Sequence, residues 1–340
     1  MTETGISSIH HVVPDHAQTR DKLRALLART PAAQALGLAV VFAAVTITIP
    51  GFLGASSINS TLVLAAFLGI AATGQTLVIL LGGIDLSVPA LIGGANVMVP
   101  ALVSDGIPFT AAFAVVILAA GALGVVNGYL VRRLRLSPLV FTLATGTIVT
   151  GLTLAWSDTG TKTGTIPDWL TNFSSPIGRT AGLSIPALVV AWAILAVGLG
   201  VILHHTVTGQ HLYATGTNER AASIAGIRTQ RIWIGAFALS AVSAAFLGIL
   251  LDGFVGAPTV GIGTPYLFTS LTAVLVGGTS LVGGRGDYWR TVLGALIVTL
   301  IGTFLISRGA GQAPQELLFG VLILLFVGLY GRDRRIRDRV

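Results

Sequence analysis

Long apolar runs separated by short polar stretches recur along most of the chain. A helix needs about 20 mostly apolar residues to cross a bilayer. Ten runs approach this length, at 33–53, 58–81, 87–103, 108–131, 138–156, 183–204, 231–253, 266–282, 290–306 and 315–331. The pattern predicts an all-α polytopic membrane protein with about ten transmembrane helices in a single transmembrane domain, 33–331.

Composition supports a membrane protein and argues against a soluble domain and against a disulfide-bonded protein. Of the 340 residues, 53% are hydrophobic and 10% are charged, whereas soluble domains carry roughly 25% charged residues. The 43 glycines suit membrane helices that pack closely. The chain has no cysteine, which excludes disulfides and thiol chemistry.

The basic residues predict the orientation in the membrane. If the N-terminus is cytoplasmic, 17 of the 20 Lys and Arg residues fall on the cytoplasmic side, and only Lys162, Arg179 and Arg308 lie outside. This bias is the one that the positive-inside rule describes. We therefore expect both termini in the cytoplasm, and we read the net charge of +7 as a sign of membrane orientation, with no nucleic-acid partner.

The third run, 87–103, is the weakest of the ten. It is short and contains Gly93, Gly94, Asn96 and Pro100, so a broken or partly re-entrant segment is an alternative to a full span. The charges favour a crossing, because otherwise the arginines of 132–135 would fall outside.

Three polar segments flank or interrupt the spans. The tail 1–32 shows no signal-peptide pattern, and its part 15–29 is either an amphipathic helix on the membrane surface or a disordered cytoplasmic tail. The external segment 157–182 is either a plain loop or a loop with a short interfacial helix around Pro167–Asn172. The basic tail 332–340 is expected in the cytoplasm near anionic lipids.

The cytoplasmic segment 209–228 carries helix signals although it is too polar to cross the membrane. Thr217 and Asn218 are candidate N-caps, Glu219 suits the first turn, and Gly226 suits the end. The alternatives are a docking helix for a soluble partner and an ordinary surface turn.

A short internal similarity links Leu81-Gly82-Gly83 with Val276-Gly277-Gly278. Both stretches end an inward-running span. Many transporters are built from repeats, although two Gly-Gly pairs in a glycine-rich chain are weak support for one.

The sequence offers no set of residues suited to catalysis. It lacks a His/Glu metal pair at helical spacing and a phosphate-binding loop, so we expect neither a metal site nor ATP hydrolysis in this chain. Ionisable residues within the spans are scarce, with Asp85, Asp252 and Glu316 near span ends. Because ion-coupled carriers use such residues, their scarcity favours a pore driven from outside the membrane.

Neutral polar residues within the spans suit an uncharged, hydroxyl-rich solute such as a sugar. The alternative is helix–helix hydrogen bonding. The candidate residues for the translocation path are five of these neutral residues together with Asp85 and Ser87, at the junction between the second and third runs. The full set is Gln75, Asp85, Ser87, Asn96, Asn127, Thr142 and Thr145.

Three segments together resemble the ribose-type sugar ABC-importer permeases. The first, 82–88, reads GGIDLSV, and Pro89 follows where the family usually has Gly. The second, 216–227, matches a cytoplasmic loop of the form G-x-N-x-x-A-A-x-x-x-G-I, and the third runs from Val276 to Gly286 and continues at Gly294-Ala295. The family's usual Asn-Gly after the penultimate span is replaced by Ser307-Arg308.

The resemblance implies a multi-pass subunit of a bacterial inner-membrane importer. Its expected partners are a second permease copy or paralogue, an extracytoplasmic sugar-binding protein, and a cytoplasmic ABC ATPase that binds ATP and Mg. The family's coupling helix corresponds here to Gly216, Thr217, Asn218, Glu219, Arg220, Ala221, Ala222, Gly226 and Ile227.

Two other function classes are alternatives to the importer. An ion-coupled or passive secondary carrier would need no ATPase, and a membrane-embedded enzyme or scaffold would need a catalytic cluster. The GGIDLSV segment argues against a branched-chain amino-acid permease. The sequence does not indicate which sugar is carried.

Overall fold

The computed structural model describes residues 31–157, 164–178, 180, 182 and 184–337, with side chains up to Gly328. The predicted tail helix 15–29 lies outside this part. The elements are α2 Ala32–Thr48, α3 Ala55–Leu80, α4 Val88–Ser104, α5 Phe109–Arg133, α6 Pro138–Trp156, α7 Asp168–Ser174, α8 Ala187–His205, α9 Val207–Thr217, α10 Glu219–Ile224, α11 Thr229–Val255, the 3-10 helix η1 Val260–Gly263, α12 Pro265–Val276, α13 Tyr288–Ser307 and α14 Gln312–Arg337. The all-α membrane-protein prediction is confirmed.

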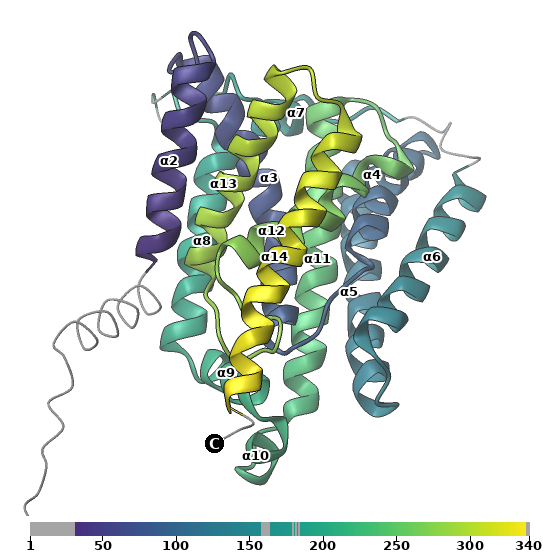
Figure 1. Cartoon of the computed structure of the whole chain (residues 1–340). Coiled ribbons are helices and arrows are strands. Elements are labelled where there is room, and N and C mark those ends of the chain that lie inside the picture. Colours follow the sequence, from purple (N-terminus) through teal and green to yellow (C-terminus); the bar gives the residue numbers. More distant parts are fainter. Residues whose placement is uncertain (1–30, 158–163, 179, 181, 183, 338–340) are drawn as a thin grey trace, which may run out of the picture.

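The long helices run in one general direction, with α7 at one end of the molecule and α10 at the other (Figure 1). Six helices of the described chain are long and apolar enough to span a membrane, and four further apolar helices of 10–17 residues lie at Ala32–Thr48, Val88–Ser104, Val260–Val276 and Gln312–Gly328. These segments follow the ten predicted runs in order. The number of crossings remains a prediction.

Several predicted boundaries differ from the structure for local reasons. The first helix ends at Thr48, five positions before the predicted limit of 53, because Pro50 and Gly51 (φ +77°) turn the chain. The eighth run was predicted to reach 282, but α12 ends at Val276 before two glycines. The third run is one continuous helix that contains Pro100. Of the two alternatives for the external segment, the short helix is present as α7.

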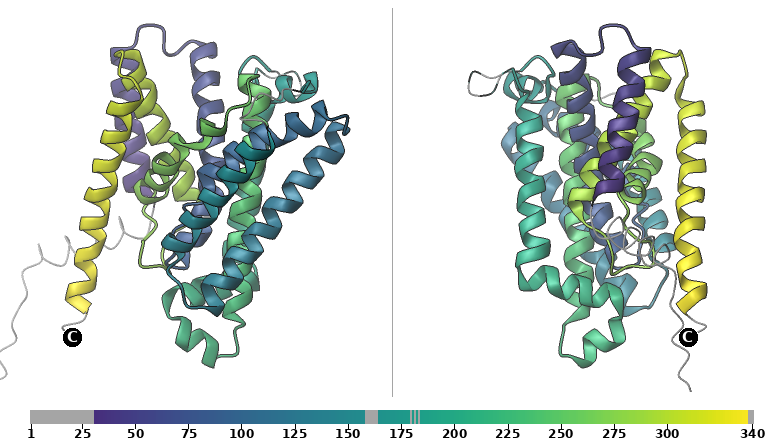
Figure 2. Two further views of the ribbon diagram at one scale, coloured as in Figure 1. Left: turned by 90° about the vertical axis from the view of Figure 1, so that its right-hand side faces the viewer. Right: turned by 60° about the vertical axis from the view of Figure 1, so that its left-hand side comes forward.

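The centre of the bundle is formed by α3 and α11. The most apolar stretch of α3 is 89% buried, whereas that of α6 is 22% buried, which leaves α6 on the periphery (Figures 1 and 2). Glycines allow α11 to approach its neighbours: a Cβ at Gly128 would lie 2.6 Å from the Cα of Ile234, and a Cβ at Gly248 would collide with the Ile92 carbonyl oxygen. These contacts explain the glycines at these two positions.

The turns after α3 and α12 share one backbone geometry. Gly82 N–H donates to Ile79 O at 2.8 Å and Gly83 N–H to Val78 O at 3.0 Å. After α12, Gly278 N–H donates to Leu275 O at 2.8 Å and Thr279 N–H to Val274 O at 3.1 Å. The similarity noted in the sequence therefore recurs in structure with a shift of one position, so that 81–83 corresponds to 277–279.

Candidate functional site: the α9–α10 hairpin and the buried polar belt

The segment 209–228 contains two consecutive helices instead of a loop with one. α9 begins early because the Thr206 hydroxyl accepts a hydrogen bond from Gly209 N–H at 3.3 Å. Asn218, one of the two predicted caps, accepts from Ala221 N–H at 3.0 Å and starts α10. Thr217, the other candidate, ends α9, and its hydroxyl donates to Tyr213 O at 2.8 Å. We call residues 206–227 the α9–α10 hairpin.

The end of α10 follows the prediction at Gly226. This residue has φ +83°, and Ile227 N–H donates back to Ala222 O at 3.0 Å. A left-handed glycine after the last turn is a common helix stop.

α10 forms the tip of the molecule in Figure 1, and its faces differ. Ala222 is buried against the rest of the chain, so it is not available on the surface of the tip. Arg220, Ala221, Ser223, Ala225 and Gly226 are exposed. Ile224, which sequence reasoning did not select, is 80% exposed and gives the tip an apolar side chain. The signal that could have found it is an isoleucine in a short polar segment.

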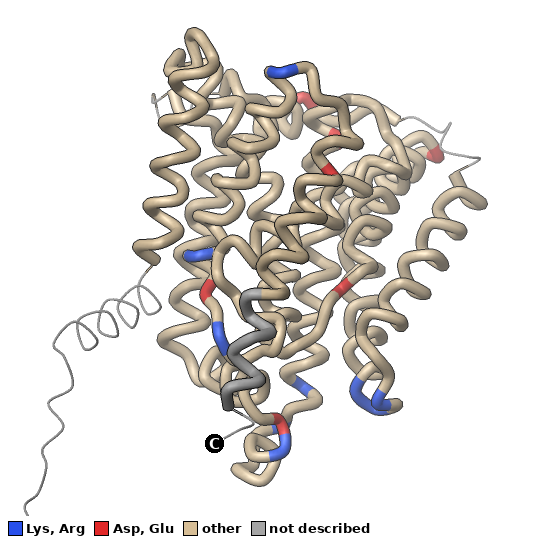
Figure 3. The backbone as a smooth tube through the Cα atoms, in the orientation of Figure 1, with Lys and Arg blue, Asp and Glu red and all other residues tan. Residues whose placement is uncertain are grey.

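Basic residues gather at the same end of the molecule as α10 (Figure 3). Glu219, in the first turn of α10, forms an ion pair with Arg132 at the end of α5. The connection between α13 and α14, which holds Arg308, lies at the opposite end. The Glu219–Arg132 ion pair thus connects the hairpin to α5, in addition to its covalent connections to α8 and α11.

The three sequence segments that resemble a permease family meet at the base of the hairpin. A Cβ at Gly216 would collide with the Leu80 carbonyl oxygen and would lie 2.8 Å from Gly284 N. Gly284 N–H donates to Leu80 O at 2.8 Å. A Cβ at Gly82 would lie 3.2 Å from Val282 O. We call this meeting point of α9, the end of α3 and the stretch 280–286 the glycine junction.

All seven candidate path residues are buried within the chain. Asp85 lies in the irregular stretch between α3 and α4, and its Oδ1 accepts from Ser87 N–H at 3.0 Å and from the Ser87 hydroxyl at 2.5 Å. Its Oδ2 accepts from the Ser240 hydroxyl at 2.8 Å. Ser240, in the middle of α11, was missed by sequence reasoning. Asp85 thereby fixes the start of α4 inside the bundle.

Other members of this buried polar belt also hold helices together. Leu86 N–H donates to the Thr142 hydroxyl at 2.9 Å, and the Thr145 hydroxyl donates to Asn127 Oδ1 at 2.8 Å. Asn96 joins α4 to two segments, because its Nδ2 donates to Gly248 O at 3.1 Å and its Oδ1 accepts from Thr259 N–H at 2.8 Å.

Some buried polar atoms of the described residues have no hydrogen-bond partner. Gln75 Oε1 and Asn127 Nδ2 are two of them, and both carboxylate oxygens of Asp252 are others. Asp85 and Asp252 are each 1% exposed. As the sequence predicts, both lie near helix ends, Asp85 between α3 and α4 and Asp252 near the end of α11. In the described chain, no three His, Asp or Glu side chains gather as a metal site would require.

Comparison with known proteins assigns the chain to a family. Residues 57–327 match the family described as "Branched-chain amino acid transport system / permease component".

The chain belongs to this family.

The family's description names branched-chain amino acids, whereas individual relatives of this permease carry sugar names. It is 34% identical over 293 residues to the ribose import permease protein of Bacillus subtilis, an alignment that covers 86% of this chain and 90% of the relative. It is 32% identical to the fructose import permease protein of Rhizobium meliloti, covering 91% and 87%. It is 30% identical to the D-allose transport system permease protein of Escherichia coli, covering 82% and 84%. No solved structure gives a significant match.

Proposed function

We propose that the chain is the transmembrane permease subunit of an ATP-driven importer of a monosaccharide in the bacterial inner membrane. The observation that carries this proposal is that the three family segments, distant in sequence, converge at the base of one exposed hairpin. The relatives named for ribose, fructose and allose support a sugar as the solute class. Family membership implies a cytoplasmic ATPase and an external binding protein as partners.

The proposed orientation places the α10 end in the cytoplasm, together with both termini. The clustering of basic residues at that end (Figure 3) supports it through the positive-inside rule. The α7 end then faces outward, where the binding protein would deliver the solute.

The α9–α10 hairpin is proposed to dock on the ATPase. When ATP binding and hydrolysis move the ATPase, the docked hairpin moves with it. The long helices α8 and α11 flank the hairpin and would tilt. The exposed residues Arg220, Ala221 and Ile224 are the proposed contact surface, whereas Ala222 would act by seating α10 on the bundle. A second permease, either a copy or a paralogue, would complete the path.

The seven polar-belt residues keep two proposed roles of unequal support. Asp85, Ser87, Asn96, Thr142 and the Asn127–Thr145 pair have hydrogen bonds within the chain, which supports a role in holding α4 and α6. Gln75 has an unpartnered oxygen, so it is the member best suited to meet a solute hydroxyl if the bundle opens.

A matched pair of substitutions tests the docking surface. We expect Ile224→Arg to reduce co-purification of the ATPase by at least about tenfold, since a charge in a desolvated apolar contact costs more than 1.4 kcal/mol. Val207→Arg, at an apolar residue of the same hairpin that is 64% exposed, is the control and should leave co-purification unchanged. Co-purification of the Ile224→Arg variant at the wild-type level would exclude this surface.

One observation favours the alternative of an ion-coupled secondary carrier. Asp252 is a buried, unpartnered carboxyl group in a spanning helix, and such groups commonly serve ion coupling. The test is uptake by proteoliposomes that contain the permease alone, with an imposed proton gradient and no ATPase. Uphill uptake by these proteoliposomes would support the carrier. Uptake that requires added ATPase and ATP would support the importer.

A further inference from the structure

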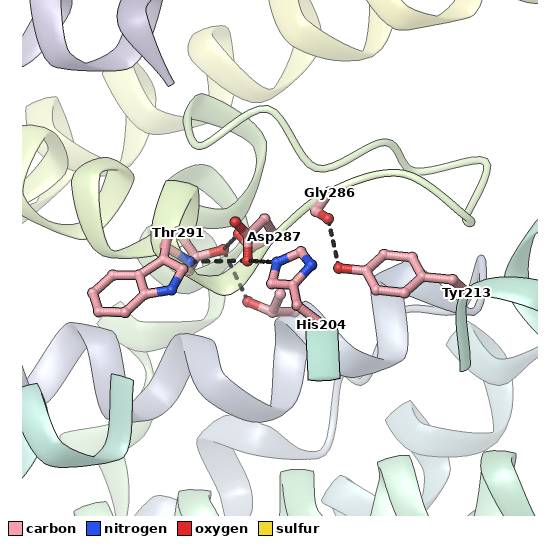
Figure 4. Close-up of polar contacts among 7 residues, drawn as sticks. His204, Tyr213, Gly286, Asp287 and Thr291 are labelled. Atoms are coloured by element: carbon pink, nitrogen blue, oxygen red, sulfur yellow. Dashed lines mark hydrogen bonds and ion pairs between the residues drawn. The ribbon is translucent and has the colours of Figure 1, made fainter. Parts of the chain in front are cut away.

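The end of α8 and the middle of α9 both contact one peptide at the start of α13 (Figure 4). His204 Nε2 lies 3.0 Å from Asp287 Oδ1. The Tyr213 hydroxyl donates a hydrogen bond to Gly286 O at 2.9 Å. The rings of His204 and Tyr213 stack, with centroids 6.1 Å apart and an angle of 27°. Two side chains on neighbouring helices therefore hold consecutive residues, Gly286 and Asp287.

The Gly286–Asp287 peptide is in turn fixed to α13. Asp287 is the N-cap of this helix, and its Oδ1 accepts from Trp289 N–H at 3.3 Å. Its carbonyl oxygen accepts from the Thr291 hydroxyl at 3.4 Å. A Cβ at Gly286 would lie 2.5 Å from Thr279, so the turn after α12, which contains Thr279, also confines the peptide. Any displacement of Asp287 must therefore displace the first turn of α13.

The next residue, Tyr288, carries the contact into the centre of the bundle. It is fully buried, and its hydroxyl donates to Gly69 O at 2.9 Å. The same hydroxyl lies 2.8 Å from Thr73 Oγ1, and it accepts from Trp192 Nε1–H at 3.2 Å. One hydroxyl thus joins α13 to α3 and α8. One helical turn on, Thr291 Oγ1 lies 3.1 Å from Thr76 Oγ1 of α3.

Apolar packing, close backbone approach and hydrogen bonding all connect α9 with the rest of the bundle, and Leu212 of α9 is buried in an apolar cluster with residues of α3, α8 and α11. At the glycine junction, α9 lies in close steric contact with backbone atoms of the end of α3 and of the stretch 280–286. A steric contact resists movement of α9 towards these atoms but does not resist movement away from them. A hydrogen bond resists separation of its atoms as well. The Tyr213 hydroxyl supplies a hydrogen bond from α9 to the Gly286–Asp287 peptide that precedes α13, and His204, at the end of the preceding helix, contacts the same peptide.

We propose that His204, Tyr213 and Asp287 are positioning residues for transport, forming a tether through which an outward movement of the α9–α10 hairpin draws the start of α13. This inference rests on the proposed function of the hairpin as the ATPase docking element. The His204 and Asp287 side chains are 44% and 20% exposed, and such accessible pairs contribute little to folding stability. Breaking the His204–Asp287 pair should therefore leave the fold intact.

The test uses the complete importer, with permease, ATPase and binding protein in proteoliposomes and D-ribose as the probe solute. The variants are His204→Ala, Tyr213→Phe and Asp287→Asn, which keeps an oxygen to cap α13. The readout is the number of solute molecules taken up per ATP hydrolysed. We expect each variant to lower this ratio at least about fivefold, the lower end of common coupling effects, with ATP hydrolysis retained.

Two controls separate the tether from a general structural role. His205→Ala alters the neighbouring exposed histidine, for which we expect an unchanged ratio. His204→Gln keeps a side-chain N–H near the position of Nε2 and should restore most of the ratio. The double variant His204→Ala/Asp287→Asn should be no worse than the worse single variant, because groups that act together are not additive.

The outcomes distinguish the tether from the proposed function. If the variants lower uptake and ATP hydrolysis in proportion, or leave the ratio unchanged, the tether is overturned. If wild-type uptake proceeds without the ATPase, the proposed function itself fails, whatever the variants do. A lowered ratio with unchanged ATPase co-purification supports the tether.

Discussion

Replacing Gly216 with alanine is expected to reduce uptake by at least about tenfold while the protein still inserts into the membrane. The added methyl group would collide with the Leu80 carbonyl oxygen and crowd Gly284 N. Both are backbone atoms, which cannot rotate away as a side chain can. Overpacking of this kind costs about 1–3 kcal/mol, and α9 must move away from α3 to relieve it. Uptake of labelled ribose by cells, normalised to permease in the membrane, measures the effect.

Gly198→Ala is the matched control for this substitution. Gly198 lies on α8, the helix that leads into α9, and a Cβ there meets no atom within 4 Å. Alanine also favours a helix over glycine by about 1 kcal/mol, so we expect normal uptake. Normal uptake by the Gly216→Ala variant would mean that the glycine junction is not needed for transport.

The second large effect is expected for Asp85→Ala, which should strongly lower the amount of monodisperse protein that survives heating in detergent. The change leaves Ser87 N–H, the Ser87 hydroxyl and the Ser240 hydroxyl without their acceptor. Each buried donor left unsatisfied costs about 1–3 kcal/mol. Because these bonds hold the start of α4 inside the bundle, α4 should loosen. Size-exclusion chromatography after a temperature series gives the measurement.

Two companion variants sharpen the interpretation of Asp85. Asp85→Asn keeps an acceptor oxygen for Ser87, so its loss of heat resistance should be much smaller. Thr147→Ala removes an exposed hydroxyl that bonds only to its own helix, at Leu143 O, and should have no effect. Equal losses in the Ala and Asn variants would show that the negative charge, and not hydrogen bonding, is what the site requires.

Local features of the chain were predictable from sequence alone. Apolar runs located the spanning helices, since burial in lipid demands them over a known length. Asn218 and Gly226 marked the ends of α10 because caps act within a few residues. α9 was not predicted because it is short and lacks a long apolar run, and its cap, Thr206, lies before the segment 209–228. The inward face of Ala222 was equally hidden, because six residues define no reliable helical face.

The candidate path shows a different limit. A polar residue in a membrane helix can face a solute or bond to another helix, and composition is the same for both. The deciding partners lie far away along the chain: Ser240 is 155 positions from Asp85, and Gly248 is 152 positions from Asn96. The Tyr213–Gly286 contact spans 73 positions. Without coordinates, the sequence could name such residues but could not pair them.

The two matching turns, 81–83 and 277–279, have a consequence for the order of events. The Leu80 carbonyl oxygen, before the first turn, accepts a hydrogen bond from Gly284 N–H, which follows the second turn in the chain. This hydrogen bond therefore connects the two turns. We expect a movement that displaces these hydrogen-bonded residues to shift α4 and α13 together instead of one after the other. Spin-label distances that caught either helix displaced while its counterpart stayed at rest would contradict concerted motion.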